Sequence, residues 1–471
     1  MKAGSKYLFK NLGFLTLGQF GTKILNFFLI PLYTNVLSTA EYGTFDFYNT
    51  TILLVVPLIT GNIADAALRF PLDEDADLNK ICKIVLKYCF FGTFLFVLFS
   101  LINNVFGIIP ALKEYTLFLI LMFIVRTFDS ALINLGRGLD CIKHIAISGV
   151  ICTAVMIGLN LLFLLSLDMG LTGYFLANII GMAVQSLYLL VTTKILKYLR
   201  KGARDKALEK QMLAYSRPLL VNNISWWVTS MSDRYIVIWF CDMAANGIYS
   251  VGYKIPSILN IFQIAFNQAW TLSAVKDYDQ EDKSGFFINL YNYYNFAMLC
   301  TCSLLIICSK FLATILYAKD FYMAWQFVPF LLVATFFGSL SGYIAGIFAA
   351  VKESKVVAKT TVCGAICNIV MNIILVPAIG PLGAAIATMI SYALIWALGL
   401  YNVKKYIRLK ISLFRDILSY VILLAQSVLL FYTEQTGQAY VAEIVLFIVI
   451  IILYWKQVRG LLQKIRSRMN K

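Results

Sequence analysis

The chain has 471 residues, of which 60% are hydrophobic and 14% are charged, and its mean hydropathy is +0.79. Soluble domains carry about 25% charged residues, so this composition excludes an ordinary soluble protein. Basic residues outnumber acidic ones by 40 to 24, and the net charge of +16 raises the question of whether the cations meet nucleic acid or follow the topology of a membrane protein.

Apolar segments follow one another along nearly the whole chain. A membrane-spanning helix needs roughly 20 mostly apolar residues. Fourteen segments meet this requirement: 12–32, 45–69, 82–109, 114–136, 145–167, 171–193, 213–240, 247–275, 286–309, 326–350, 357–379, 382–403, 412–432 and 440–456. The first segment follows three lysines, as in a secretory signal, but it is too long and no small-residue cleavage site follows before Tyr33. The sequence therefore predicts an all-α membrane protein with about fourteen transmembrane helices.

The basic residues fall almost entirely on one side of these predicted spans. If the N-terminus lies in the cytoplasm, 33 of the 40 lysines and arginines face inward, and only Lys113, Lys310 and Lys319 lie in outer loops. An excess of cations on the cytoplasmic side is the positive-inside rule. The charge therefore predicts a multi-pass membrane protein with both termini in the cytoplasm, and it gives no reason to expect nucleic acid as a partner.

Two pairs of similar segments recur in the two halves of the chain. "LDMGLTGYFLA" (167–177) and "AIGPLGAAIA" (378–387) share two glycines and an alanine at an offset of 210, and "EYGTFDFYN" (41–49) resembles "ANGIYSVGY" (245–253) at an offset of 204. Such repeats predict two pseudo-symmetric six-helix bundles around a central cavity, which is typical of alternating-access transporters. The predicted organisation is a bundle over 1–193, a basic cytoplasmic linker over 194–212, a second bundle over 213–411, and helices 13 and 14 with a basic tail over 412–471.

Four basic residues lie inside the predicted spans: Lys23, Arg126, Arg234 and Lys254. A lysine or arginine at the centre of a membrane helix costs about 2.5–3.5 kcal/mol, so such a residue faces the protein interior or a water-filled cavity. In the first span, polar residues recur every three or four positions and form one stripe with Lys23. We interpret the four cations as an anion-binding set, and we expect a polar lining from Gln19, Asn26, Asn222, Asn223, Asn260 and Asn267.

Acidic residues beside these cations leave a second interpretation open. Arg126 and Asp129, three positions apart, are equally compatible with a structural ion pair. Asp233 and Arg234 are adjacent and point to different faces of a helix, so we do not expect them to pair. The acids expected to take part in coupling or gating are Asp65, Asp129 and Asp233.

Local sequence features predict breaks and contacts within the spans. Asp65 and Arg69, four positions apart, predict a local pair or a gate. Pro57 and Pro256 interrupt the second and eighth spans, where backbone groups are freed from the helix. Three glycines at four-residue spacing predict the close approach of a neighbouring helix: Gly338, Gly342 and Gly346.

No sequence motif points to an enzyme or to a metal site. The chain has no GxxxxGK[ST] phosphate loop, and its ten cysteines do not show metal-ligand spacing. A single histidine, His144, and short outer loops around 33–44 and 310–325 leave no place for a catalytic set. We therefore predict no catalytic residue, metal or cofactor, and leave open coupling to Na⁺ or H⁺.

Several segments resemble the polysaccharide-biosynthesis flippases of the Wzx type, within the multidrug/oligosaccharidyl-lipid/polysaccharide exporter superfamily. The likeness is carried by "EYGTFDFYNT" through "NIADAALRF" (41–70), by "SDRYIVIWF" with "NGIYSVGYKIPSILNIFQIAFNQAW" (232–270), and by "VPAIGPLGAAIATMISY" (376–392). It covers almost the whole chain and includes the fourteen-helix count.

The resemblance implies a cargo and a cellular role. The cargo would be an oligosaccharide repeat unit on undecaprenyl pyrophosphate, moved from the inner to the outer leaflet for O-antigen (lipopolysaccharide), capsule or another surface polysaccharide. The cations would bind the pyrophosphate and the amides would bind sugar hydroxyls, in a monomer that works beside polysaccharide polymerase machinery.

Two alternatives stay open at this point. An ion-coupled multidrug exporter of the same superfamily is expected to have more acids than cations in its cavity. A membrane glycan polymerase is expected to carry catalytic loops outside the membrane.

Overall fold

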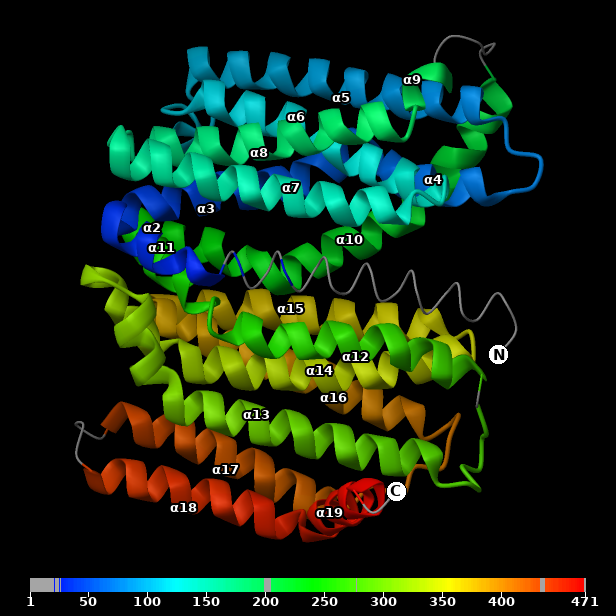
Figure 1. Cartoon of the computed structure of the whole chain (residues 1–471). Coiled ribbons are helices and arrows are strands. Elements are labelled where there is room, and N and C mark those ends of the chain that lie inside the picture. Colours follow the sequence, from blue (N-terminus) through cyan, green and yellow to red (C-terminus); the bar gives the residue numbers. More distant parts are fainter. Residues whose placement is uncertain are drawn as a thin grey trace. The chain divides into compact units, whose positions relative to one another are not determined.

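The structure, a computed structural model, describes residues 21, 25, 27–198, 205–276, 278–432 and 437–469 (Figure 1). Regular secondary structure in these ranges is helical. The first helices are α2 (Ile30–Val36), α3 (Thr39–Ile59), α4 (Ile63–Arg69), α5 (Leu78–Phe106), α6 (Thr116–Gly138), α7 (Ile142–Asn160), α8 (Gly170–Thr192), α9 (Ile195–Tyr198) and α10 (Lys206–Phe240). The later ones are α11 (Met243–Gly252), α12 (Pro256–Lys276), α13 (Phe286–Leu316), α14 (Val328–Ala350), α15 (Ser354–Ile379), α16 (Pro381–Val403), α17 (Leu413–Tyr432), α18 (Gly437–Leu453) and α19 (Trp455–Met469).

The predicted spans from the second to the fourteenth all coincide with helices. Within the described ranges, nine helices are long and apolar enough to cross a membrane, or ten if the bent pair formed by α3 and α4 counts as one span. α10 and α12 coincide with predicted spans but are not among the nine, because polar residues interrupt their apolar faces. The protein is therefore an integral membrane protein with an all-helical fold, while the total of fourteen spans stays a prediction.

The chain forms two compact units, Met1–Trp227 and Val228–Lys471, and the boundary lies within α10. Both copies of the glycine-containing repeat start a helix in the same way: Gly170 at the start of α8 and Gly380 before α16 have positive φ values of 52° and 63°. Glycine adopts this conformation without steric cost. The local likeness is real, whereas the pseudo-symmetry of the halves and the domain boundaries at 193, 212 and 411 stay predictions.

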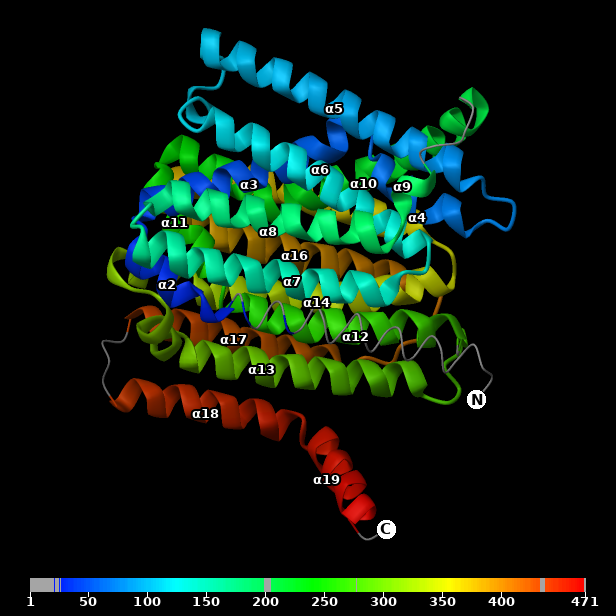
Figure 2. The same ribbon diagram turned by 45° about the horizontal axis from the view of Figure 1, so that its top comes forward.

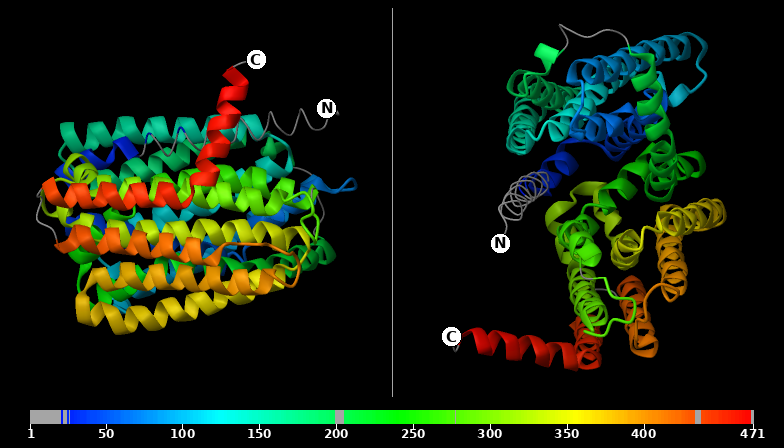
Figure 3. Two further views of the ribbon diagram at one scale, coloured as in Figure 1. Left: turned by 90° about the horizontal axis from the view of Figure 1, so that it is seen from below. Right: turned by 90° about the vertical axis from the view of Figure 1, so that its right-hand side faces the viewer.

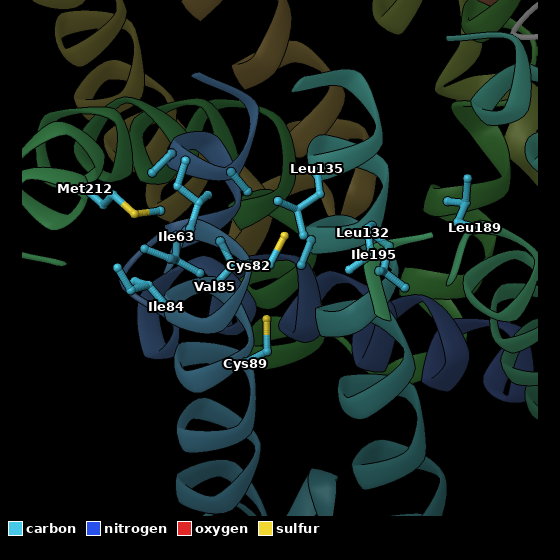
Figure 4. Close-up of a cluster of buried hydrophobic side chains, with 14 of the residues drawn as sticks. Ile63, Cys82, Ile84, Val85, Cys89, Leu132, Leu135, Leu189, Ile195 and Met212 are labelled. Carbon is cyan, nitrogen blue, oxygen red and sulfur yellow. The ribbon is translucent and has the colours of Figure 1, made fainter. Parts of the chain in front are cut away.

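The core of the first unit lies where α4, α5 and α6 meet. Side chains such as Ile63, Val85 and Leu135 are almost fully buried there, together with residues of α8, α9 and α10 (Figure 4). α3 and α4 meet at an angle of 68°, and Asn62, with a φ of 56°, separates them. The predicted interruption near Pro57 is thus confirmed. α4 continues in a different direction from α3.

Ion pairs connect the start of α10 to α5 in the first unit. Lys80 Nζ lies 3.1 Å from Asp205 Oδ2, and Lys87 Nζ lies 2.6 Å from Glu209 Oε1. Asp205 also accepts hydrogen bonds from the backbone N–H groups of Ala207 and Leu208. The bond from the Leu208 N–H and the ammonium of Lys80 lower the pKa of Asp205. An ionised Asp205 therefore caps α10 and holds it beside α5.

In the second unit, α12 lies against the glycine-rich face of α14. Gln263 Nε2 donates to the carbonyl of Gly338 at 3.2 Å, and a Cβ atom at Gly342 would lie 2.7 Å from Asn267 Nδ2. A Cβ atom at Gly346 would lie 2.3 Å from Trp270 Nε1. The prediction that these glycines admit a neighbouring helix is confirmed, because a side chain at Gly342 or Gly346 would overlap α12.

We expect Gly346→Ala to destabilise the protein by about 1–3 kcal/mol, the usual range for overpacking a filled core. The added methyl group would meet the ring of Trp270, which is stacked on Tyr343 and donates to its carbonyl at 2.8 Å. Thermal unfolding of the purified protein in detergent measures the change. Gly158→Ala on α7 is the matched control, because no atom lies within 4 Å of its added Cβ, and equal melting temperatures would contradict the contact.

The last helices form a separate layer of the second unit. α17 and α18 pack against each other and against α13, and α19 leaves the axis of α18 after Tyr454 (Figures 2 and 3). α19 begins the predicted basic tail, with Lys456 and Arg459 in its first two turns.

Candidate functional site

Three of the predicted site residues lie outside the described residues: Gln19, Lys23 and Asn26. Their roles stay predictions, and the other ten can be located in the structure. The candidate cations and acids of each unit are described separately.

Asp233 and Arg234 are the centre of a buried polar network in the second unit. Their exposed fractions are 1% and 5%. Arg234 Nη1 lies 3.3 Å from Asp233 Oδ1 and 3.1 Å from the carbonyl oxygen of Ser230. The guanidinium also lies 4.8 Å from the ring centroid of Tyr253. Our expectation that these adjacent residues would not pair was therefore wrong, because the long arginine side chain folds back along its own helix to reach the carboxylate.

Hydroxyl groups from two other helical segments complete the shell around Asp233. Its Oδ2 atom accepts hydrogen bonds from Tyr249, from Tyr253 at 2.8 Å and from Thr388 at 3.4 Å. Asp233 therefore has hydrogen-bond partners at both carboxyl oxygens, as a buried polar group requires. Arg234 is correspondingly neutralised within its own unit.

Amide side chains on α15 extend this network. Asn368 donates to Thr388 Oγ1 at 3.3 Å and accepts from Asn372 at 3.1 Å. Ser232 Oγ lies 3.5 Å from Asn368 Oδ1, which joins α10 to α15. The result is a group of oxygen atoms around one buried acid that has Arg234 as its counter-charge.

Arg126 and Asp129 lie on α6 in the first unit. Asp129 is 4% exposed and accepts a hydrogen bond from Ser186 Oγ at 3.4 Å. The nearest partner of the Arg126 guanidinium is Met182 Sδ, at 3.7 Å from Nη1. Among the described residues, no carboxylate lies within ion-pair distance of Arg126. The two residues make no direct contact, but the charge of Arg126 acts on Asp129, so both interpretations stay open for this half-buried cation in a membrane helix.

Asp65 has a different partner from the one its spacing predicts. It accepts from Asn62 Nδ2 at 2.7 Å and lies 3.5 Å from Asn223 Nδ2, whereas Arg69 forms an ion pair with Asp73. The predicted pair of Asp65 with Arg69 is therefore wrong. The break before α4 places an amide beside Asp65 in the first turn, and Arg69 is at the helix end, where Asp73 in the following turn is closer.

The remaining predicted residues are spread over α10, α11 and α12. Lys254 lies half-buried in the turn between α11 and α12, just before Pro256, so the predicted interruption at this proline is confirmed. Asn222 and Asn260 are exposed on the surface of their units. Asn267 lies against Gly342, so helix packing accounts for its position.

Sequence reasoning missed several residues of these networks. Tyr249, Tyr253, Thr388 and the two asparagines of α15 are common residue types in membrane helices, and their sequence positions give no sign that they converge on Asp233. Asp416 and Glu443 were also missed, although each is an acid within an otherwise apolar segment, which is the signal that could have found them.

The family model described as polysaccharide biosynthesis protein matches residues 8–272, which is more than half of the chain. The chain belongs to this family. No curated protein matches it significantly.

Solved structures place this polysaccharide biosynthesis protein in a known transporter fold. A structure described as the lipid II flippase MurJ in an inward closed conformation is 16% identical, with a TM-score of 0.69, 95% of this chain and 99% of that chain being covered. An inward-facing multidrug resistance MATE family transporter of the MOP superfamily is 12% identical, with a TM-score of 0.68 and coverages of 82% and 95%. These structures confirm the fold that the resemblance implied, and the family model confirms the polysaccharide-biosynthesis family.

A third structure of this fold comes from a MOP superfamily transporter of Pyrococcus furiosus, whose description reports a reversed polarity of its binding pocket. It is 14% identical, with a TM-score of 0.58 and coverages of 84% and 96%. At such identities the likeness establishes the fold of this polysaccharide biosynthesis protein, and its cargo has to be argued from its own residues.

Proposed function

We propose that the protein is a flippase that moves oligosaccharide repeat units, linked to undecaprenyl pyrophosphate, from the inner to the outer leaflet by alternating access. The observation that carries this proposal is Arg126, a cation within a membrane helix and without a carboxylate partner among the described residues. An unpaired guanidinium there is suited to a diphosphate, because its planar donors match phosphate oxygens in pairs. Family membership supplies the polysaccharide context.

The other candidate residues divide between cargo and coupling. Lys254 and, outside the described residues, Lys23 are further cations for the diphosphate, and Gln19, Asn26, Asn222, Asn223 and Asn260 are candidates for sugar contacts. Arg234 contributes less than the sequence predicted, because Asp233 neutralises it. Asp233, with its shell of oxygen atoms, is the first candidate for Na⁺ or H⁺ coupling, followed by Asp129 and Asp65.

The topology belongs to the same proposal. The excess of inward-facing cations supports a location in the bacterial cytoplasmic membrane with both termini in the cytoplasm. The product would then reach the outer leaflet, where a polysaccharide polymerase could use it. In this proposal the protein acts as a monomer, because all the candidate residues belong to one chain.

An ion-coupled multidrug exporter is the second candidate function. It is favoured by the MATE-like fold and by the buried acids Asp129 and Asp233, since acids attract organic cations. The four cations predicted within the membrane favour an anionic cargo instead. One of them, Arg126, makes no ion pair among the described residues.

Deletion of the gene in the native host distinguishes these functions. Lipid-linked repeat units should accumulate on the cytoplasmic leaflet, measured by their protection from enzymes added outside intact spheroplasts. Drug sensitivity without accumulation would support the exporter. Accumulation of unpolymerised units on the outer leaflet would support a polymerase.

We expect Lys23→Ala to insert normally and to lose translocation, because the predicted first span would lack its cation. Lys23→Arg should retain part of the activity, since it keeps the charge but changes its shape. The measurement is complementation of the deletion strain at matched protein levels. Full transport by Lys23→Ala would refute a role for this lysine.

A further inference from the structure

Glu443 is an exception among the buried acids of the described residues. Five acidic residues are buried there: Asp129, Asp233, Asp282, Asp416 and Glu443. The first four accept hydrogen bonds at their carboxylates, from Ser186, from the Asp233 network, from the backbone N–H groups of Phe287 and Ile288, and from Arg415 with Tyr454. Neither carboxyl oxygen of Glu443 has a hydrogen-bond partner among the described residues.

The surroundings of Glu443 are polar but already satisfied. Ser303 on α13 donates to Gln426 Oε1 on α17 at 2.8 Å, and Gln426 Nε2 donates to the main-chain oxygen of Glu443 at 3.2 Å. All three residues are 0% exposed. α13, α17 and α18 therefore enclose the carboxyl group, and among the described residues only the amide of Gln426 acts on it as a donor, without a hydrogen bond of ordinary geometry.

Among the side chains that the structure describes, the helices packed against α18 bring no charge close to Glu443. On α13, Lys310 is seven residues beyond Ser303, about 10 Å along the helix, and its ammonium lies 4.2 Å from the ring centroid of Trp325. On α17, Asp416 is ten residues before Gln426 and is bound by Arg415. The other titratable side chains described on these elements are Tyr291, Tyr293, Tyr294, Cys300, Cys302 and Cys308 on α13, Arg415 and Tyr420 on α17, Tyr440 on α18 itself, Tyr454 after it, and Lys456 and Arg459 at the start of α19.

An ionised carboxylate in such a place would be very unfavourable. Burying an unpaired charge costs many kcal/mol, and a buried acid avoids this cost by taking up a proton. A neutral carboxyl group fits the site, because it has no charge to compensate and its O–H can donate within the polar cluster.

We propose that Glu443, with Gln426 and Ser303, forms a proton-binding site within α13, α17 and α18, on different helices from the Asp233 network. The carboxylate takes one proton from water and becomes a carboxylic acid, with no other bond made or broken. Glu443 is six residues from the first residue of α18, about 9 Å along the helix.

The oxygen atoms around Glu443 suit a proton better than a metal ion. Hard cations take about six oxygen ligands. Gln426 Oε1 already accepts from Ser303, and the described residues contain no group of three or more acidic, histidine or cysteine side chains that could hold a metal.

Carbodiimide labelling tests the proposal directly. Dicyclohexylcarbodiimide adds to protonated carboxyl groups in apolar surroundings and leaves a stable N-acylurea, which peptide mass spectrometry locates. In the full-length protein at about pH 7 we expect Glu443 to be labelled, and Asp416, held by Arg415, to remain unlabelled in the same sample. Glu443→Gln should lose the label, and NaCl should not protect Glu443. Labelling at about pH 5 but not at about pH 7, or protection by Na⁺, would overturn the proposal.

A melting comparison provides a second, independent readout. A folded protein that holds a proton on Glu443 binds more protons than its unfolded chain above about pH 4.3, so the contribution of Glu443 to stability is present at low pH and is lost as the pH rises. The melting temperature of the wild type relative to Glu443→Gln should therefore fall by several degrees between about pH 5 and pH 9. Glu281→Gln, at an exposed acid of the same unit, should show a flat difference.

A flat or rising difference for Glu443→Gln would reject the proton site. If the carbodiimide does not label Glu443 at any pH, the comparison of melting temperatures alone tests the proton site. Neither measurement involves transport, so both outcomes are independent of the proposed flippase function.

Discussion

Arg126→Gln is expected to reduce translocation of lipid-linked oligosaccharide by roughly 10- to 100-fold while the protein still inserts and folds. The estimate follows from losing one charge-assisted hydrogen bond to a diphosphate, about 1.5–3 kcal/mol. Arg126→Lys should retain part of the activity, because a lysine keeps the charge but loses the paired donors. Translocation in a reconstituted vesicle assay, normalised to inserted protein, is the measurement.

Two controls separate cargo binding from structure at Arg126. Lys143→Gln removes the same charge from an exposed position on α7 and should transport normally. If Arg126 served mainly to stabilise Asp129, Arg126→Gln would lower the melting temperature, and Arg126→Gln with Asp129→Asn would restore it. Normal transport by the single variant would remove Arg126 from the proposed site.

Asp233→Ala should destabilise the protein by about 3–5 kcal/mol, the usual effect of removing one partner of a buried ion pair. The substitution leaves Arg234 without its carboxylate and the hydroxyls of Tyr249, Tyr253 and Thr388 without a shared acceptor. Thermal unfolding in detergent and the amount of inserted protein should both fall.

Charge-balanced variants show whether the effect arises from the buried pair. Asp233→Asn with Arg234→Gln should recover much of the stability lost in Asp233→Asn, since neither residue then carries an uncompensated charge. Glu281→Gln, an exposed acid of the same unit, should unfold like the wild type. Wild-type stability of Asp233→Ala would mean that the network contributes little to the fold.

The sequence predicted the helices well because each membrane span has to bury its own backbone hydrogen bonds. That requirement produces long apolar runs, and predicted segments such as 382–403 and 357–379 differ from α16 and α15 by three residues or fewer at each end. The breaks near Pro57 and Pro256 and the glycine face of α14 were also predictable, since proline and glycine act on their own turn or their immediate neighbour.

The partners of the charged residues were less predictable. Spacing along one helix suggested that Asp65 would pair with Arg69 and that Arg234 would avoid Asp233, and both expectations were wrong. Partners on other elements or in the following turn, such as Tyr249 for Asp233 and Asp73 for Arg69, offered better geometry.

The sequence by itself therefore determined that the protein lies in the membrane and which segments form its helices, because hydrophobic burial and backbone hydrogen bonding depend on local composition. The tertiary structure alone decided how the charges in those helices are met: Arg234 pairs with Asp233, Arg126 makes no direct contact with a carboxylate among the described residues, and Glu443 lies among groups that already bond to one another. The reason is that the free energy of a buried charge depends on donors and counter-charges brought in by other helices, whose positions are set by packing across the whole unit.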